Sequence, residues 1–310
     1  MKTKTSIFLI AFLTIMAGLP IHSETIRGNK NIITKTIPIK DYDEVSAAGS
    51  MTFEYEQSDK EAYFEITVDE NILPYINIEV QGKKLIVAPK RDEDSWHNSN
   101  YNLNPTVYKI KSNSKDLQKI SFAGSGHFIA NSPLRTSSFT IDMAGSGEVE
   151  LTRVVTASNI KANMAGSGSI NASELAIDNT DLNMAGSGRI VVNKGLKGNQ
   201  AKLNLAGSGK LIVYKADVSK ADCNLSSSGE LTITGTTNEA SYNTAGSGKI
   251  NAYDCKANQV SANVSGSGRV ELYASTQLNA SVMGSGNITY KGSPSVKSNK
   301  SGSGSIKPAD

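Results

Sequence analysis

The sequence predicts an all-β fold: a right-handed parallel β-helix, or β-solenoid, of about ten turns of roughly 20 residues each, with a β-rich N-terminal cap. Two observations lead to this prediction. The tetrapeptide Ala-Gly-Ser-Gly, or a close variant, recurs every 18 to 21 residues over the C-terminal two thirds of the chain. Apolar and polar residues alternate on both sides of each copy, which is typical of β-strands. The composition agrees, because 27 glycines and only 6% aromatic residues suit a narrow core built of many small layers.

The repeated tetrapeptide predicts a tight corner between two strands. Glycine is expected where side chains would crowd or where φ is unusual. The central serines of the copies are Ser125, Ser146, Ser167, Ser187, Ser208, Ser228, Ser247, Ser267, Ser285 and Ser303. The third residues after them, which we expect to point inward, are Phe128, Val149, Ile170, Ile190, Leu211, Leu231, Ile250, Val270 and Ile288. A β-sandwich or propeller is the alternative, but a stacked coil explains directly why every corner keeps the same phase.

The domain organisation follows from where this period begins and ends. Residues 1–23 carry two lysines and then an apolar run, which is typical of a secretory signal peptide. Residues 24–117 lack the period and are expected to form the β-rich N-terminal cap, although Ala48-Gly49-Ser50 resembles a first corner. Residues 118–296 form the repeat β-helix, and residues 297–310 a degenerate last turn or tail. We therefore expect an exported protein, in the periplasm or at the cell surface or outer membrane, with no membrane span after signal removal.

The charge pattern argues against a nucleic-acid partner. The formal net charge is +3, and Lys2 and Lys4 of the predicted signal peptide supply two of these charges. Basic and acidic residues are otherwise interspersed, without the basic patch that phosphate binding requires.

One outward-facing row is regular enough to be a candidate binding surface. Four residues before the serines of six successive repeats the sequence has asparagine, and Asp142 precedes the row. The row consists of Asn163, Asn183, Asn204, Asn224, Asn243 and Asn263. Stacked amides can hydrogen-bond along the rod axis, which is a structural role. A stripe that contacts carbohydrate is the functional alternative.

No catalytic, cofactor-binding or metal-binding residue is predicted. His22 leaves with the signal peptide, and His97 and His127 are too isolated to form a metal site or a triad. The Gly-Ser-Gly corners do not match a nucleophile elbow. The polar loop Arg91–Pro105 contains Asp92, Glu93 and Asp94, and it is either a solvated loop or an oxygen-rich cation site.

Two further groups of residues bear on chemistry. Asp142, Glu148 and Glu150 lie close in sequence, as the carboxylates of a polysaccharide-degrading β-helix would, although surface charge also explains them. Cys223 and Cys255 are separated by more than one and a half predicted turns, about 8 Å along the axis. That separation predicts two free thiols, not a disulfide.

Three stretches of the chain resemble a known family. They are Gly28–Thr34 with Asp43–Ser46, Val68–Tyr75, and the series that begins at Leu117–Gly126. They resemble the auto-transporter adhesin family with a head GIN domain, which is widespread in Bacteroidetes. The resemblance implies an exported β-helical protein without established catalytic residues. One corner departs from the pattern, because Ser226-Ser227-Ser228-Gly229 replaces the usual tetrapeptide.

Together these observations lead us to expect a non-enzymatic exported cell-envelope protein. It would act as an adhesin or binding protein that presents an extended polar β-helix surface to a glycan or to a cell-envelope protein. The alternatives are a polysaccharide-degrading β-helix enzyme, either lyase or hydrolase, and a structural envelope protein that self-assembles. No cofactor is expected, and the oligomeric state stays open.

Overall fold

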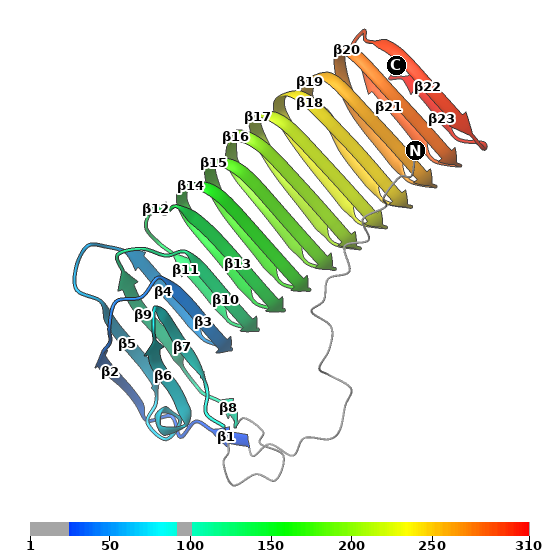
Figure 1. The fold of residues 1–310 in the computed structure, drawn as a ribbon. Coiled ribbons are helices and arrows are strands. Elements are labelled where there is room, and N and C mark those ends of the chain that lie inside the picture. Colours follow the sequence, from blue (N-terminus) through cyan, green and yellow to red (C-terminus); the bar gives the residue numbers. More distant parts are fainter. Residues whose placement is uncertain (1–24, 92–100, 310) are drawn as a thin grey trace.

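The computed structural model describes residues 25–91 and 101–309 (Figure 1). The predicted signal peptide, residues 1–23, lies outside the described residues, as do Asp92, Glu93, Asp94 and His97 of the polar loop. The described chain is almost entirely β-strand, and its one helical element is the short 3₁₀ turn η1, Leu73–Tyr75. Within the described residues no helix is long and apolar enough to cross a membrane.

The repeats form a β-solenoid of about ten turns, as the sequence predicts. Each complete turn is one long, bent strand that pairs in parallel with the turns before and after it, so the rod grows by stacking (Figure 1). These strands are β14 (Glu148–Gly166), β15 (Ser169–Gly186), β16 (Arg189–Gly207), β17 (Lys210–Ser227), β18 (Glu230–Gly246), β19 (Lys249–Gly266) and β20 (Arg269–Gly284). The first turns consist of β10 (Lys119–Gly124), β11 (His127–Ala130), β12 (Leu134–Arg135) and β13 (Ser138–Gly145).

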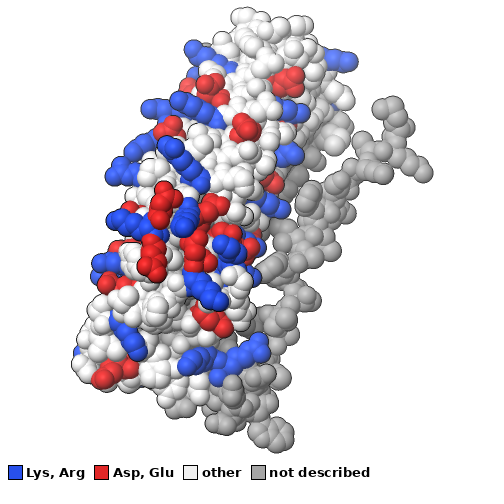
Figure 2. All heavy atoms as spheres, turned by 60° about the vertical axis from the view of Figure 1, so that its left-hand side comes forward, with Lys and Arg blue, Asp and Glu red and all other residues white. Residues whose placement is uncertain are grey.

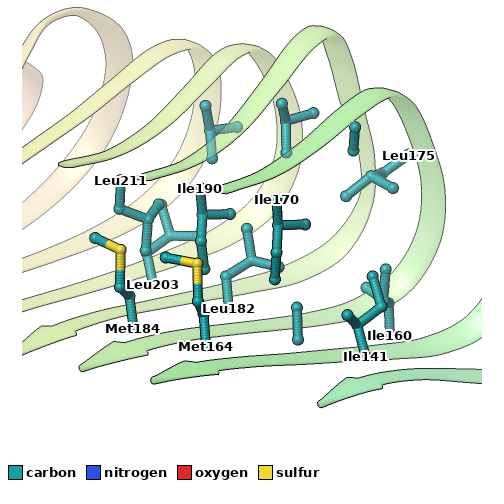
Figure 3. Packing of buried hydrophobic residues seen from close by; sticks show 14 of the residues in the cluster. Ile141, Ile160, Met164, Ile170, Leu175, Leu182, Met184, Ile190, Leu203 and Leu211 are labelled. Carbon is teal, nitrogen blue, oxygen red and sulfur yellow. The ribbon is translucent and has the colours of Figure 1, made fainter. Parts of the chain in front are cut away.

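The core is a set of inward ladders of like residues. Met164 of β14 pairs with Met184 of β15, and both side chains are about 2% exposed (Figure 3). Ile170, Ile190 and Leu211 form a second ladder on the other side of the corners. Leu175 and Leu196 belong to a third wall, which closes the turn. Because most inward residues lie between similar residues of adjacent turns, the narrow core fills with few large aromatic side chains, such as Tyr242.

The corners explain why the tetrapeptide keeps its glycines. Gly186 has a φ of +131°, and a Cβ there would overlap the carbonyl oxygen of Gly166 in the preceding turn. That carbonyl accepts hydrogen bonds from the amides of Ser187 and Gly188, at 3.0 and 3.2 Å. The close approach therefore requires glycine both for its backbone conformation and for its missing side chain.

Ser227 is the exception that the sequence pointed out. It adopts a φ of +92°, as the corner glycines do, although it carries a side chain. The register between β16 and β17 ends at Ala206 and Ser226. The amides of Ser228 and Gly229 make no hydrogen bond to Gly207 among the described residues, whereas the equivalent amides of the preceding turn bond to Gly186. The corner survives, but its contact with the previous turn is weaker.

The N-terminal part contributes a solenoid layer of its own. Strands β3 (Glu44–Gly49) and β4 (Thr52–Gln57) stack in parallel on β10 and β11, and Gly49 aligns with Gly124. The expectation that Ala48-Gly49-Ser50 forms a first corner is therefore confirmed. Strands β7 (Lys84–Pro89) and β9 (Tyr108–Ser114) cover the other side of this layer, because β7 pairs in parallel with β3 and β9 with β4.

The remaining N-terminal strands lie against this cover. Strand β5 pairs antiparallel with both β2 and β9, β6 pairs with β7, and β1 pairs with β8. Aromatic side chains fill the core between the N-terminal layer and the first repeat turn, where the rings of Phe53 on β4 and Phe128 on β11 stack at 5.1 Å between centroids. The bounds are β1 (Thr25–Arg27), β2 (Ile32–Pro38), β5 (Tyr63–Asp69), β6 (Ile76–Gln81), β7 (Lys84–Pro89), β8 (Asn102–Asn104) and β9 (Tyr108–Ser114).

Asp69, at the end of β5, joins the segment before β2 and the segment before β9 through hydrogen bonds. Its side chain is fully buried, and one carboxylate oxygen accepts the amide of Lys30 at 2.7 Å. The other oxygen accepts the amide of Thr106 at 2.6 Å and that of Val107 at 3.4 Å. Burial acts to raise the pKa of this carboxyl, but the hydrogen bonds to the ionised form prevail and hold the pKa below its usual value.

The last described turn of the rod is largely exposed. The last turn consists of β21 (Asn287–Lys291), β22 (Ser295–Ser301) and β23 (Ser305–Pro308). Every residue of β22 is exposed, and Lys300 stands beside Val282 where earlier turns carry a buried apolar residue. Ile288 is the last fully buried core residue, in line with the predicted fading of the core.

Candidate binding surface

The six predicted asparagines form one continuous ladder on the outside of the rod, which we call the asparagine ladder. Each lies between two inward residues of its strand, on β14 to β19 in succession, and is half-buried or exposed. From Asn183 on, each side-chain amide Nδ2 donates to Oδ1 of the asparagine one turn before. The distances are 3.1 Å for Asn183 to Asn163, 2.8 Å for Asn204 to Asn183, 2.9 Å for Asn224 to Asn204, 3.0 Å for Asn243 to Asn224, and 2.8 Å for Asn263 to Asn243. The stacking predicted from the sequence is confirmed.

Asp142 of β13 gives the asparagine ladder its direction. Asn163 donates to Oδ1 of Asp142 at 2.8 Å, and Lys119 forms an ion pair with Oδ2 at 3.0 Å. An ionised carboxylate can only accept hydrogen bonds, so Asn163 must present its NH₂ to Asp142 and its oxygen to the next turn. The same orientation then repeats at every rung. Burial acts to raise the pKa of Asp142, but the bonds from Asn163 and Lys119 outweigh it and keep the pKa below its usual value.

The rows that flank the asparagine ladder change character along the rod. Two residues before the asparagines, the first turns alternate in charge, with Lys161, Asp181, Lys202 and Asp222. Farther on, this row becomes Ser241, Ser261 and Asn279, which are uncharged. Two residues after the asparagines the side chains are alanine or serine. The surface is therefore flat, and its C-terminal half is polar but neutral.

A shallow depression of about 390 Å³ lies at the C-terminal end of the asparagine ladder. Asn224, Asn243 and Asn263 contribute to its lining, together with Ser281 and Met283 of β20. Met283 is 59% exposed, the largest exposed fraction among the exposed large hydrophobic side chains of the described residues. The sequence analysis did not identify Met283, which is the one methionine in a row that otherwise contains alanine or serine.

The carboxylates considered for an enzyme do not converge on one centre. Asp142 lies before its corner and contacts Lys119 and Asn163. Glu148 and Glu150 lie after the corner, where their carboxylates are 3.9 and 3.4 Å from Nε2 of His127. A glycosidase general acid needs a raised pKa, whereas that of Asp142 is lowered. Within residues 25–91 and 101–309, no group of three or more His, Cys, Asp or Glu residues could hold a metal ion.

Both cysteines are free and buried, as the turn count predicted. Burial raises the pKa of the Cys255 thiol to about 11 and that of Cys223 as well, so neither forms the reactive thiolate near neutral pH. Tyr242 lies in the same interior region, since it pairs with Cys223 across adjacent turns, and Cys255 interacts with its hydroxyl. That hydroxyl is buried without a hydrogen bond of standard geometry in the described chain.

The charged side chains of the visible face are mixed in sign. Figure 2 shows lysines and arginines interleaved with aspartates and glutamates over the turns, with no broad region of one sign. Ion pairs on the rod likewise join opposite charges of adjacent turns, such as Lys210 with Glu230, at 3.0 Å, and Lys249 with Glu271, at 2.8 Å. This face offers no extended basic surface for a nucleic acid.

The fold and this surface define a class: β-solenoid proteins that display a long, flat polar face instead of a deep pocket. The family model described as "Putative auto-transporter adhesin, head GIN domain" matches residues 41–178 and 179–294, and the chain belongs to that family. No functionally curated protein matches the chain.

Three solved structures cover nearly the same length. A "Putative lipid binding protein" from Parabacteroides distasonis ATCC 8503 is 40% identical, with a TM-score of 0.60, and covers 93% of this chain and 100% of its own. A "putative adhesin" from Parabacteroides merdae ATCC 43184 is 27% identical, with a TM-score of 0.57 and the same coverage. Another from P. distasonis is 28% identical, with a TM-score of 0.51, and covers 92% of this chain and 100% of its own.

Proposed function

We propose that the protein is a non-enzymatic, exported cell-envelope protein of the adhesin type, which binds a glycan or another envelope component along the asparagine ladder. The observation that carries this proposal is the ladder itself: six hydrogen-bonded amides in successive turns, ending in the depression beside Met283. The family description and the adhesin names of two neighbours support the same class. The predicted signal peptide supports export to the periplasm or cell surface.

The mechanism would be multivalent contact with a pre-ordered surface. The amides are fixed in one orientation by their neighbours. Little side-chain conformational entropy is therefore lost when a ligand binds to them. The second N–H of Asn204 also contacts Asp181, and that of Asn243 contacts Ser241. The other amides retain a second N–H, and all of them retain part of their carbonyl capacity, for hydrogen bonds outward. Single contacts of this kind are weak, but a chain molecule that lies along several turns gains from many of them at once.

A glycan array with the purified protein tests this function. We expect the protein to bind glycans without producing new reducing ends or unsaturated products. Cleavage of a glycan would refute the hypothesis that the protein is not an enzyme. The neighbour named as a lipid binding protein makes vesicle binding a necessary parallel measurement.

A pair of variants locates the binding face. The double variant Ala206→Arg and Ala245→Arg places two long side chains beside the asparagine ladder, where both alanines are exposed. We expect it to abolish binding without changing the fold. Thr156→Arg, at an exposed position of the third wall, is the matched control and should bind as the wild type does. Equal binding by both variants would show that the ligand uses another face.

A further inference from the structure

The asparagine ladder ends at Asn263 with an acceptor that nothing fills. Because every amide donates toward the N-terminus, each Oδ1 is left to accept from the following turn. Asn263 donates to Asn243 at 2.8 Å, but the following turn has Ser281 where a seventh asparagine would stand. Among the described residues no group donates to Oδ1 of Asn263, and the Ser281 hydroxyl makes no hydrogen bond. Asp142, six rungs before Asn263, thus determines that the C-terminal end of the ladder presents an oxygen.

An apolar surface lies directly beside this acceptor. Met283 is two residues after Ser281 on β20, so both side chains are on the outer face, and both line the depression with Asn263. Along the same row, Ser265 precedes Met283 and Ser301 follows it, each with a far smaller side chain. Met283 therefore stands above its neighbours at one edge of the depression.

The residues that line the depression are all uncharged. The outward positions two residues before and after Asn243, Asn263 and Ser281 contain serine, alanine, asparagine or methionine, and none is charged. The nearest lysines in register are Lys297 and Lys300 of the last turn, which pair with Asn279 and Val282, and neither lines the depression. The lining itself therefore offers hydrogen bonds and apolar contact but no charged group.

We propose that this end of the asparagine ladder is a subsite for one pyranose ring of a neutral glycan. A sugar hydroxyl would donate to Oδ1 of Asn263 and accept from the Ser281 hydroxyl, while the apolar C–H face of the ring packs on the Met283 side chain. A pyranose combines hydroxyl donors with an apolar face, as this surface requires. The proposal rests on the proposed function and names its ligand class. A lipid acyl chain fits less well, because the depression is shallow and lined by amides.

Ser281→Asn is the decisive variant, because it fills the acceptor without removing anything from the fold. The new amide would donate to Oδ1 of Asn263 and extend the ladder by one rung. We expect an unchanged or higher melting temperature together with an affinity at least about tenfold weaker, the scale of one lost hydrogen bond. Met283→Ser, which installs the residue of the neighbouring turns, should weaken binding by a similar factor. Ser121→Asn adds an amide to the same row beyond Asp142 and is the matched control.

Isothermal titration with neutral oligosaccharides of glucose, N-acetylglucosamine and mannose measures these affinities, and vesicles of phosphatidylcholine measure lipid binding in parallel. Weaker sugar binding by Ser281→Asn and Met283→Ser, with Ser121→Asn unaffected, supports the subsite. If all three variants bind sugar like the wild type, the subsite is refuted while the adhesin function stands. If the wild type binds none of these sugars but a charged glycan or the vesicles, the neutral-sugar assignment is overturned. If it binds no envelope component at all, both proposals fail.

Discussion

Asn163 donates its side-chain amide to the carboxylate of Asp142 at 2.8 Å, and this single contact orients the amides of five further turns. A row of asparagines alone could point in either direction along the rod. The carboxylate removes this choice, because it cannot donate a hydrogen bond. The end of the asparagine ladder that faces the depression is consequently an acceptor.

The contribution of Asp142 to stability should depend on pH. Its pKa is lowered in the folded protein, so the ionised form is stabilised above the pKa of the unfolded chain, and this stabilisation is lost as the pH falls through the folded value. Asp142→Asn should therefore lower the free energy of unfolding by less than about 1 kcal/mol at pH 7, since the group is partly exposed. Denaturant unfolding at pH 7 and at strongly acidic pH measures the difference, which should vanish in acid.

Asp69 should contribute more to the free energy of unfolding than Asp142 does, because it is fully buried and accepts hydrogen bonds from three backbone amides. We expect Asp69→Ala to lower the free energy of unfolding by about 3 kcal/mol, since these donors lose a charged acceptor. The pKa of Asp69 is also lowered, so its contribution should likewise disappear as the pH falls through the folded pKa. Asp59→Ala, at an exposed position, is the control, and an equal loss in both variants would contradict the assigned role.

Ser227→Gly should stabilise the protein. Ser227 has a φ of +92°, which costs a residue with a side chain of the order of 1 kcal/mol relative to glycine. Removing its Cβ should also allow the amides of Ser228 and Gly229 to approach Gly207. We expect a gain of about 1 kcal/mol and slower hydrogen exchange at these two amides. Ser228→Gly, one residue further on and without a positive φ, should give no gain; if it stabilises equally, strain at Ser227 is not the cause.

Tyr242→Phe should leave stability unchanged or raise it by about 1 kcal/mol, because it removes a buried hydroxyl that lacks a hydrogen bond. Tyr242→Ala should instead cost about 3–5 kcal/mol, because the largest inward side chain of this region would leave a cavity. Thermal unfolding of the two variants measures both effects. A substantial loss in the phenylalanine variant would mean that the hydroxyl contact with Cys255 stabilises the core.

Much of the fold could be predicted because a solenoid repeats short-range rules. The alternation around each corner predicts which residues point inward, and Met164, Ile170 and Leu182 are buried accordingly. The spacing of the corners predicts which residues stack, so the contacts along the asparagine ladder followed from counting. Even the first corner at Gly49 could be identified, although its neighbours in sequence lack the period.

The candidate site was less predictable. The sequence pointed to the six asparagines but not to Met283, because an isolated methionine among alanines and serines gives no periodic signal. It also grouped Asp142 with Glu148 and Glu150 by proximity along the chain. In the structure a corner separates them, and Asp142 contacts Lys119 of the preceding turn instead. A tight turn directs side chains four residues before it and two residues after it to different faces.

The sequence by itself determined the period, the corners, the inward ladders and the outward row of asparagines, since each depends only on distance along the chain and on the two-residue alternation of a strand. The tertiary structure alone decided which way the amides point and where the row ends in an open acceptor beside Met283. It also decided that β7 and β9 return to cover the first layer, after a long excursion through β5 and β6. These features depend on contacts between particular side chains and distant segments, for which a repeating pattern carries no information.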